Sequence, residues 1–402
     1  MKKRILFVDD DPLLLSVYDA MLEGEPHWSC ITAGNGTAAL KTLAQEPCDV
    51  VVSDMRMPGM DGIELMTEVC HRHPQTSRII ISGLGDQEEI ARGLETTHQF
   101  LTKPVKLVEL LATLDRIGQL DAYLQDDKLK ALAGKLDSLP SFPSAFMQIM
   151  TEINSEDPSV EAVADIIVKD PALTAKMLQV ANSAAFGLAQ RVNNPFEAVQ
   201  FLGMGTVRSL SLSAHVFSSF ENAGLHGFSA QKLWDDALGC AQITRTIMQA
   251  EKAVEADIQD ACTAALLRNA GQLMLAVNFP KEFQQAITRA GQLNVPLQTA
   301  EQEIFGATHS GVAAYLFGLW GLSVPMVEAV AFHLEPGRSA VSTFSPLAAV
   351  HVAHVLSQEL RQEKLPGQPA ELNHQFLAGL GLDGRLDVWR SEFENLSATQ
   401  DI

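Results

Sequence analysis

The chain has 402 residues, of which 47% are apolar, and its 29 basic and 49 acidic residues give a net charge of −20. This length predicts about two or three domains, and the apolar content excludes a disordered chain. Nucleic-acid binding needs several Lys or Arg contacts to phosphate, and the sequence contains no basic block, so we expect no DNA or RNA partner.

The cysteines and the N-terminus indicate a cellular compartment. The five cysteines are scattered and contain no Cys-x-x-Cys pair, which is typical of reduced thiols. Met1–Arg4 precedes only four apolar residues before a run of aspartates, so it is no signal peptide. No apolar run approaches the roughly 18 residues of a membrane span. We therefore expect a soluble, cytoplasmic protein without membrane insertion.

The first part of the chain alternates strand and helix patterns. Short, continuous, β-branched runs occur at Ile5–Val8, Val50–Val52 and Ile79–Ile81, as in parallel strands that are covered on both faces. Helical patterns separate them, for example at Leu13–Leu22 and Gly62–Val69. The alternation repeats about five times and predicts a doubly wound α/β domain.

Polar side chains follow the predicted strands. Asp9 and Asp10 follow the first strand and Asp54 the third, while Ser82 and Lys103 follow the last two. The carboxyl ends of parallel strands form one ligand crevice, so these groups should converge. Neighbouring carboxylates repel by roughly 4 kcal/mol per pair at an effective dielectric near 20, which a hard cation such as Mg²⁺ offsets. A cation beside a carboxylate, with Lys and a hydroxyl nearby, suits phosphoryl transfer.

The same residues resemble a known family. Over about residues 3–120 the chain is similar to the receiver domain of two-component response regulators, with motifs at Ile5–Asp11, Val51–Gly62, Ile80–Gly83 and Phe100–Pro104. The resemblance implies a flavodoxin-like fold that a sensor histidine kinase phosphorylates. The chain would then be a cytoplasmic signal-transduction phosphoprotein of a phosphorelay.

The resemblance also implies a phospho-acceptor and a Mg²⁺ site. Asp54 is the expected phospho-accepting nucleophile and metal ligand. Asp10 would bind Mg²⁺ directly, Asp9 through water, and Arg56 through its backbone carbonyl. A single aspartate after a strand is more often a helix N-cap, and this is the role expected of Asp11.

Three further residues have roles implied by the family. Lys103 would pair with the phosphoryl group, and Ser82 would form a hydrogen bond with it. Phe100 would be the switch aromatic, whose rotamer follows Ser82.

Residues 121–137 form the expected linker. Leu129, Leu132 and Leu136 are spaced as one stripe of a helix. Two interpretations remain open: a short spacer packed on a neighbouring domain, or a continuation of the last receiver helix. In the second case the helix would transmit the switch or pair with a second chain in a homodimer.

After Pro143 the strand signals disappear. Asp170 before Pro171 indicates an N-cap and a first helical residue, and Leu173, Met177, Val180, Ala181 and Ala184 continue as an amphipathic stripe. Such a run of helices predicts an all-α bundle.

The helical region resembles the HDOD domain, a non-catalytic relative of the HD metal-dependent phosphohydrolases. The resemblance covers about residues 138–335 and rests mainly on Asp170–Ala184, Ala198–Gly203 and Leu266–Gly271. It implies an HD-like helical fold whose partners are signalling proteins, and cyclic-di-GMP enzymes are among the candidates.

The family's metal ligands fall on six positions of this chain. The family's first His falls on Asp236, and its His-Asp pair falls on Arg268 and Asn269. Its later histidines fall on His309 and His333, and its final Asp falls on His354. The second residue of the family's later His-His pair is Leu334 here. Only His309 and His333 keep the family's ligand type.

Arg268 is the decisive departure. Its guanidinium stays charged in proteins, so a fixed positive charge stands where the family holds a metal. We therefore expect neither a metal nor catalysis in this domain, and only phosphotransfer and autodephosphorylation in the receiver. We also expect an ion pair between Asp236 and Arg268 in place of the metal. The alternative is that the two are unrelated residues on solvated faces.

The predicted domains are a receiver (1–120), a helical linker (121–137), the HDOD domain (138–336) and a C-terminal helical extension packed on it (337–402). The predicted function is a response regulator in which phosphorylation of Asp54 switches the protein contacts of an inactive HDOD adaptor. Two alternatives remain: a phosphohydrolase of cyclic dinucleotides or nucleotides with a remodelled site, and a nucleotide-binding module that uses Arg268.

Overall fold

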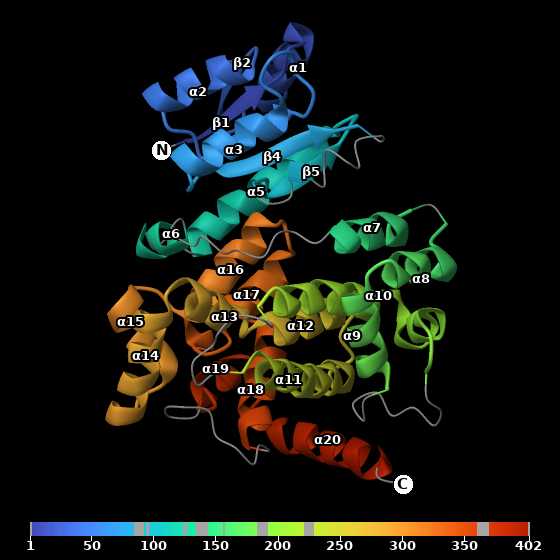
Figure 1. Cartoon of the computed structure of the whole chain (residues 1–402). Helices are drawn as coiled ribbons and strands as arrows, with labels where there is room; N and C mark the ends of the chain where they lie inside the picture. The colour runs from blue at the N-terminus through green and yellow to red at the C-terminus, as the bar shows by residue number, and fades with distance from the viewer. Residues whose placement is uncertain are drawn as a thin grey trace. The chain divides into compact units, whose positions relative to one another are not determined.

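The computed structural model describes residues 2–83, 92–93, 96–123, 127–133, 144–155, 157–182, 192–220, 229–359 and 370–400. The chain divides into two compact units. The first comprises residues 1–125 with Phe317–Leu322, and the second comprises residues 126–316 and 323–402. Figure 1 labels the helices and strands of both units.

The first unit contains the predicted parallel sheet. Its strands are β1 (Lys3–Val8), β2 (Trp28–Ala33), β3 (Val50–Asp54), β4 (Ser77–Ser82) and β5 (Gln99–Thr102). Their order in the sheet is β2-β1-β3-β4-β5, and every neighbouring pair is parallel. The predicted doubly wound α/β fold is therefore confirmed.

Helices cover both faces of this sheet. They are α1 (Pro12–Leu22), α2 (Gly36–Gln45), α3 (Gly62–Arg72) and α5 (Leu107–Tyr123). One face packs against α2 and α3 through Leu43 and Met66, and the other packs against α1 and α5 through Tyr18 and Leu114. Asp11 caps α1 as expected, because its carboxylate accepts a hydrogen bond from the Leu13 amide at 2.8 Å.

The second unit is all helical over its described residues (Figure 1). Its helices up to residue 278 are α6 (Asp127–Ala133), α7 (Ser144–Ile153), α8 (Val160–Val168), α9 (Pro171–Ala181), α10 (Pro195–Ser218), α11 (Ala230–Ala250), α12 (Glu255–Leu267) and α13 (Ala270–Asn278). The later elements are α14 (Pro280–Leu293), α15 (Leu297–Phe305), α16 (His309–Leu319), α17 (Val324–Phe332), the 3₁₀ helix η2 (Pro336–Arg338), α18 (Pro346–Glu359), α19 (His374–Gly379) and α20 (Leu386–Gln400).

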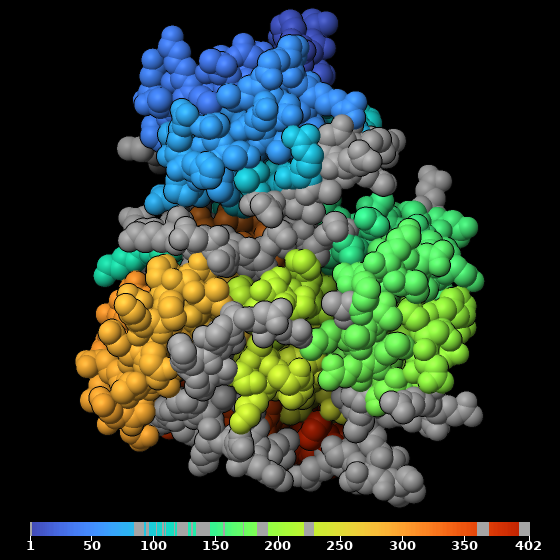
Figure 2. Space-filling view, in the orientation of Figure 1, coloured from blue at the N-terminus to red at the C-terminus, as the bar shows by residue number. Residues whose placement is uncertain are grey.

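The centre of the helical unit is the packing of α11 and α12 against each other and against α18, with α17 also on α12. Figure 2 shows α14 and α15, in orange, on one flank of this unit and α7 to α9, in green, on the opposite flank. Asp236 lies on α11, Arg268 ends α12 and His354 lies on α18, so the packing of these helices sets the geometry of the three residues.

The predicted start of α9 is present. Asp170 accepts a hydrogen bond from the Leu173 amide at 3.0 Å, and Pro171 is the first helical residue. Leu173, Met177 and Val180 of the predicted stripe are buried. The last stripe residue, Ala184, lies outside the described residues.

Helix α6 covers the described part of the linker. Leu129 and Leu132 are both buried, and the Leu129 methyl groups lie against Gly311 in the same unit. Leu136 lies outside the described residues. These contacts favour the interpretation of α6 as a spacer packed on the helical unit.

The C-terminal helix α20 is attached to α11. The Trp389 indole is fully buried and donates to Glu251 Oε1 at 2.8 Å, and Arg385 forms an ion pair with the same carboxylate at 2.6 Å. None of the helices in the described part of the chain is long and apolar enough to cross a membrane.

Candidate functional site

The carboxyl edge of the sheet gathers the predicted phospho-acceptor and its partners. Asp54 is the last residue of β3, and its Oδ1 accepts a hydrogen bond from the Met55 amide at 2.9 Å. The Lys103 ammonium lies 2.6 Å from the same oxygen. The Asp54 side chain is only 10% exposed, so a single oriented cation faces a carboxylate that is largely removed from water.

Asp9 and Asp10 complete an acidic cluster with Asp54. One oxygen from each of the three carboxylates lies within 4.8 Å of the others. Asp9 is buried, and burial raises its pKa, as do the charges of Asp54 and Asp10, while the Asp11 amide and Lys103 act in the opposite direction. Mutual repulsion of this kind is what a divalent cation relieves.

The free oxygen of Asp9 tests whether a cation fits. Asp9 Oδ1 accepts a hydrogen bond from the Asp11 amide at 2.9 Å, whereas Oδ2 is buried and has no hydrogen-bond partner among the described residues. A buried carboxylate oxygen without a donor is costly unless a cation or water satisfies it. The cluster therefore fits Mg²⁺, the ion that receiver domains generally hold at such a site.

A glycine shapes the backbone beside the acceptor. A Cβ at Gly62 would lie 2.2 Å from the carbonyl oxygen of Asp54, and the Gly62 amide donates to the Met55 carbonyl at 2.9 Å. Only glycine allows this close approach of α3 to the end of β3.

The two predicted switch residues lie on neighbouring strands. Ser82 is buried at the end of β4, and its carbonyl accepts a hydrogen bond from the Lys103 amide at 2.8 Å. Phe100 on β5 is half-buried and packs against the α2/α3 face of the core. Arg56 is exposed just after β3, two residues beyond Asp54.

Tyr18 is a neighbour of this site that sequence reasoning missed. Its ring stacks on Phe7 with centroids 4.7 Å apart, and burial together with the charges of Asp9 and Asp54 raises its pKa to about 12. The phenol therefore stays neutral. Nothing in the sequence pattern indicated its proximity to the acidic cluster.

In the helical unit, the side chain of Arg268, which was expected at one of the family's metal-ligand positions, is completely buried. Its Nη2 donates to Asp236 Oδ2 on α11, and its Nη1 donates to the Ala265 carbonyl at 2.6 Å. Its Nε donates to His354 Nδ1 on α18 at 3.1 Å. Asn269 donates to Asp236 Oδ2 at 2.8 Å. The expected ion pair between Asp236 and Arg268 is present, and the alternative that both lie on solvated faces is wrong.

The other former ligand positions surround this ion pair. His333 is fully buried; its Nδ1 lies 2.9 Å from the Val330 carbonyl, and its ring meets that of His354 edge-on with centroids 5.0 Å apart. Burial and the charge of Arg268 hold the pKa of His333 well below its usual value. The pKa of His354 is likewise held well below its usual value, by burial and by the neighbouring His333 and Arg268. Both imidazoles are therefore neutral.

His309 belongs to a separate polar pair within the site. Its Nδ1 lies 2.7 Å from Glu301 Oε2, and its Nε2 lies 3.3 Å from the Gln272 amide nitrogen. Glu301 also accepts from the His309 backbone amide at 2.9 Å and is itself fully buried. Sequence reasoning missed both Glu301 and Gln272, because neither occupies a family ligand position.

Several potential ligand atoms are used internally. Asp236 Oδ2 accepts from both Arg268 and Asn269, and His354 Nδ1 accepts from Arg268. Among the described residues, only Asp9, Asp10 and Asp54 place three acidic, His or Cys ligand atoms close enough for a metal. The observed contacts suit a polar cross-brace between α11, α12 and α18.

Known proteins are similar to each part of the chain. The family described as "Response regulator receiver domain" matches residues 5–115, and the family described as "HDOD domain" matches residues 139–336. The transcriptional regulatory protein GlrR of Escherichia coli is 34% identical over 125 residues, which are 31% of this chain and 28% of that protein. The chain spans less than half the length of the curated relatives it matches, at 41% and 28% for two of them.

Two solved structures share the helical fold. An HDOD domain protein of unknown function from Geobacter sulfurreducens is 20% identical with a TM-score of 0.57, covering 70% of this chain and 98% of that one. A putative phosphohydrolase from Shewanella amazonensis is 22% identical with a TM-score of 0.51, covering 69% of this chain and 99% of that one. The chain thus contains a response regulator receiver domain at residues 5–115, followed by an HDOD domain at residues 139–336.

Proposed function

We propose that a histidine kinase phosphorylates Asp54 and that this modification switches the protein contacts of a non-catalytic HDOD domain. The domain limits we assign are those expected from the sequence: receiver 1–120, linker 121–137, HDOD domain 138–336 and C-terminal extension 337–402. The partner of the HDOD surface is a signalling protein, and enzymes of cyclic-di-GMP metabolism are the first candidates to test.

The acceptor role of Asp54 is supported by its contact with Lys103. The ammonium at 2.6 Å is placed to neutralise charge on a phosphoryl group attached to the carboxylate. Asp9 and Asp10 would hold Mg²⁺ with Asp54 and the Arg56 carbonyl, and the metal would supply charge neutralisation during transfer. Ser82 and Phe100 would then report the modification to the surface of the domain.

One observation carries the non-catalytic assignment. The buried guanidinium of Arg268, at a position that the family resemblance assigns to a metal ligand, donates hydrogen bonds to Asp236 and to His354. A divalent metal at this place would meet a buried positive charge and carboxylate and imidazole atoms that already accept hydrogen bonds. A phosphohydrolase with a remodelled site would instead bind a divalent metal in the helical unit.

The test combines phosphorylation with capture of a partner. Purified protein with Mg²⁺ and a small phosphodonor should gain one phosphoryl group per chain, and Asp54→Ala should gain none, while the exposed Asp115→Ala behaves as the wild type. Immobilised wild-type protein should then capture a protein from native lysate in one phosphorylation state only. Capture that ignores Asp54 would contradict the switch. One tightly bound transition metal per chain, lost in Asp236→Ala, would favour the phosphohydrolase.

A further inference from the structure

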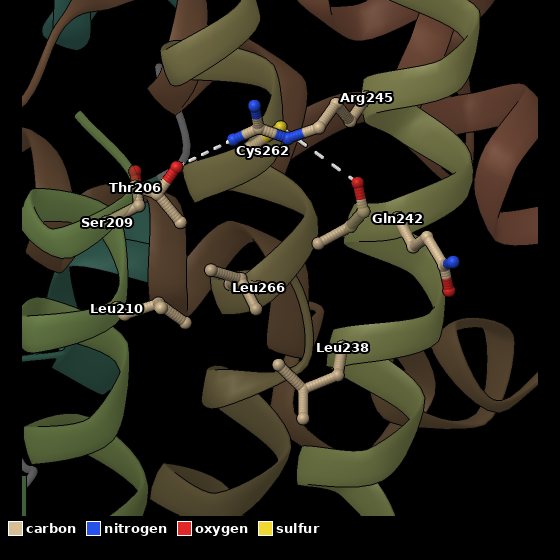
Figure 3. Close-up of a pocket in the computed structure, with 9 residues that line it drawn as sticks. Thr206, Ser209, Leu210, Leu238, Gln242, Arg245, Cys262 and Leu266 are labelled. Carbon is tan, nitrogen blue, oxygen red and sulfur yellow. Dashed lines mark hydrogen bonds between the residues drawn. The ribbon is translucent and has the colours of Figure 1, made fainter. Parts of the chain in front are cut away.

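A pocket between α10, α11 and α12 lies outside both sites described above. Figure 3 shows it with Arg245 and Thr206 at one end and Leu210, Leu238 and Leu266 at the other. Its enclosed space is about 60 Å³, and the volume reaches about 470 Å³ only when the space open to solvent is counted, so a small ligand would lie partly in the pocket and partly in its mouth. The pocket is therefore two-sided, with a polar end and an apolar end.

The polar end carries one positive charge. Arg245 Nη2 donates to Thr206 Oγ1 at 2.9 Å, and the guanidinium is half-buried. Of the nine residues drawn in Figure 3 as its lining, Arg245 is the only one that is charged. Within the described part of the chain no carboxylate forms an ion pair with Arg245. Since a guanidinium has five N–H donors, it retains donors for a ligand.

The Ser209 hydroxyl and the Cys262 thiol near Arg245 carry no charge. Ser209 is buried, and its hydroxyl already pairs with Thr263 at 2.6 Å. Burial raises the pKa of the Cys262 thiol to about 11, so this side chain is neutral and adds to the apolar wall. The cation of Arg245 thus faces a pocket without a counter-anion of its own.

We propose that this pocket binds a small monocarboxylate with an apolar body, either an aromatic acid or a short acyl chain. The planar fork of Arg245 matches a carboxylate in two parallel hydrogen bonds, which are strong in a partly desolvated place. The three leucines then contact the apolar body. One cation suits one negative charge, and the net charge of −20 disfavours ligands with several phosphates.

The position of the pocket gives the ligand a route to the core. Leu238 stands two residues from Asp236 on α11, and Leu266 stands two residues from Arg268 at the end of α12. A ligand that contacts both leucines would therefore touch α11 and α12, the two helices that the buried ion pair joins. The proposal is independent of Asp54 phosphorylation and adds a second, chemical input to the helical unit.

The test is calorimetric titration of the full-length chain with sodium phenylacetate and with sodium hexanoate. We expect saturable binding of one molecule per chain for at least one of the two acids, and no binding of the neutral phenylacetamide. Arg245→Gln should weaken binding at least tenfold, about 1.4 kcal/mol. Ala241→Leu, which adds a side chain to the lining without removing a charge, should also abolish it.

Matched controls separate this pocket from general charge effects and from the receiver switch. Arg289→Gln removes an exposed arginine of the same unit, and Asp54→Ala removes the phospho-acceptor; both should bind as the wild type does. The proposal is overturned if neither carboxylate binds saturably, if Arg245→Gln binds equally well, or if inorganic phosphate binds in preference to both acids.

Discussion

Arg268 donates a hydrogen bond to Asp236 in the interior of the helical unit, where their side chains are 0% and 3% exposed. The pair joins α12 to α11, and His354 extends it to α18. Arg268 therefore ties together three helices in the interior of the unit.

Removing one partner of this pair should destabilise the helical unit strongly. We expect Asp236→Ala to lower its free energy of unfolding by about 3–5 kcal/mol, because the guanidinium of Arg268 is left buried without a counter-charge. Arg268→Met should act in the same direction. Urea unfolding of the full chain, resolved into its two transitions, measures the change.

The double variant Asp236→Leu/Arg268→Met supplies the decisive comparison. Because buried ion pairs can often be replaced by apolar residues, the double variant should recover much of the lost stability. At the exposed pair of Arg289 and Glu303, Arg289→Met should change stability by less than about 1 kcal/mol. An Arg268→Met protein as stable as the wild type would rule out the cross-brace.

Gly271 should tolerate no side chain. A Cβ at this position would lie 1.9 Å from the carbonyl oxygen of His309, which is backbone and cannot turn aside. We expect Gly271→Ala to destabilise the helical unit by more than about 2 kcal/mol, through overpacking. Thermal unfolding followed by calorimetry would show this as a lower melting temperature of one transition.

Gly239 on α11 is the matched control, since an added Cβ there meets nothing within 4 Å. Gly239→Ala replaces a helix-interior glycine and should stabilise the unit by about 0.5–1 kcal/mol. Equal effects of the two substitutions would contradict the close contact between α13 and the start of α16.

The convergence of Asp9, Asp54, Ser82 and Lys103 could be predicted from the sequence, because each ends or follows a strand and the carboxyl ends of parallel strands meet at one edge of the sheet. In the helical unit a different argument, the resemblance to a family, predicted that Asp236 meets Arg268, since opposite charges stand at two positions that the family brings together.

Other contacts depend on packing that no sequence period encodes. The turn between α15 and α16 brings the Glu301 carboxylate to the His309 backbone amide, and both residues are buried. Arg245 on α11 donates to Thr206 on α10, and the two residues are 39 positions apart in the chain. A buried acid and a half-buried arginine look the same in sequence as residues on a solvated helix face.

The buried histidines should make the helical unit sensitive to acid. The pKa of His333, like those of His351 and His354, is lowered by burial, so these rings stay neutral when folded. In the unfolded chain they bind protons below about pH 6.5. The unfolded state therefore binds more protons there, and stability should fall as the pH drops from about 6.5, by up to roughly 1.4 kcal/mol per pH unit for each histidine.

The slope of stability against pH between about 5 and 6.5 checks this point. His333→Met should reduce the slope by about one proton, whereas the exposed His27→Gln in the first unit should leave it unchanged. A slope that His333→Met does not alter would show that this imidazole is protonated in the folded state.

Mg²⁺ binding at the acidic cluster should weaken as the pH falls. Burial and the neighbouring charges of Asp54 and Asp10 raise the pKa of Asp9 above its usual value, and a proton on Asp9 competes with the cation. Below that raised pKa, the apparent Kd for Mg²⁺ should increase about tenfold per pH unit, because one proton must leave for each ion bound. Calorimetric titration with magnesium chloride at a series of pH values measures this change in Kd.

Asp9→Asn should weaken Mg²⁺ binding and remove most of this pH dependence, whereas the exposed Asp115→Asn on α5 should preserve both. If Asp9→Asn binds Mg²⁺ as the wild type does, the buried oxygen of Asp9 is satisfied by something other than the cation.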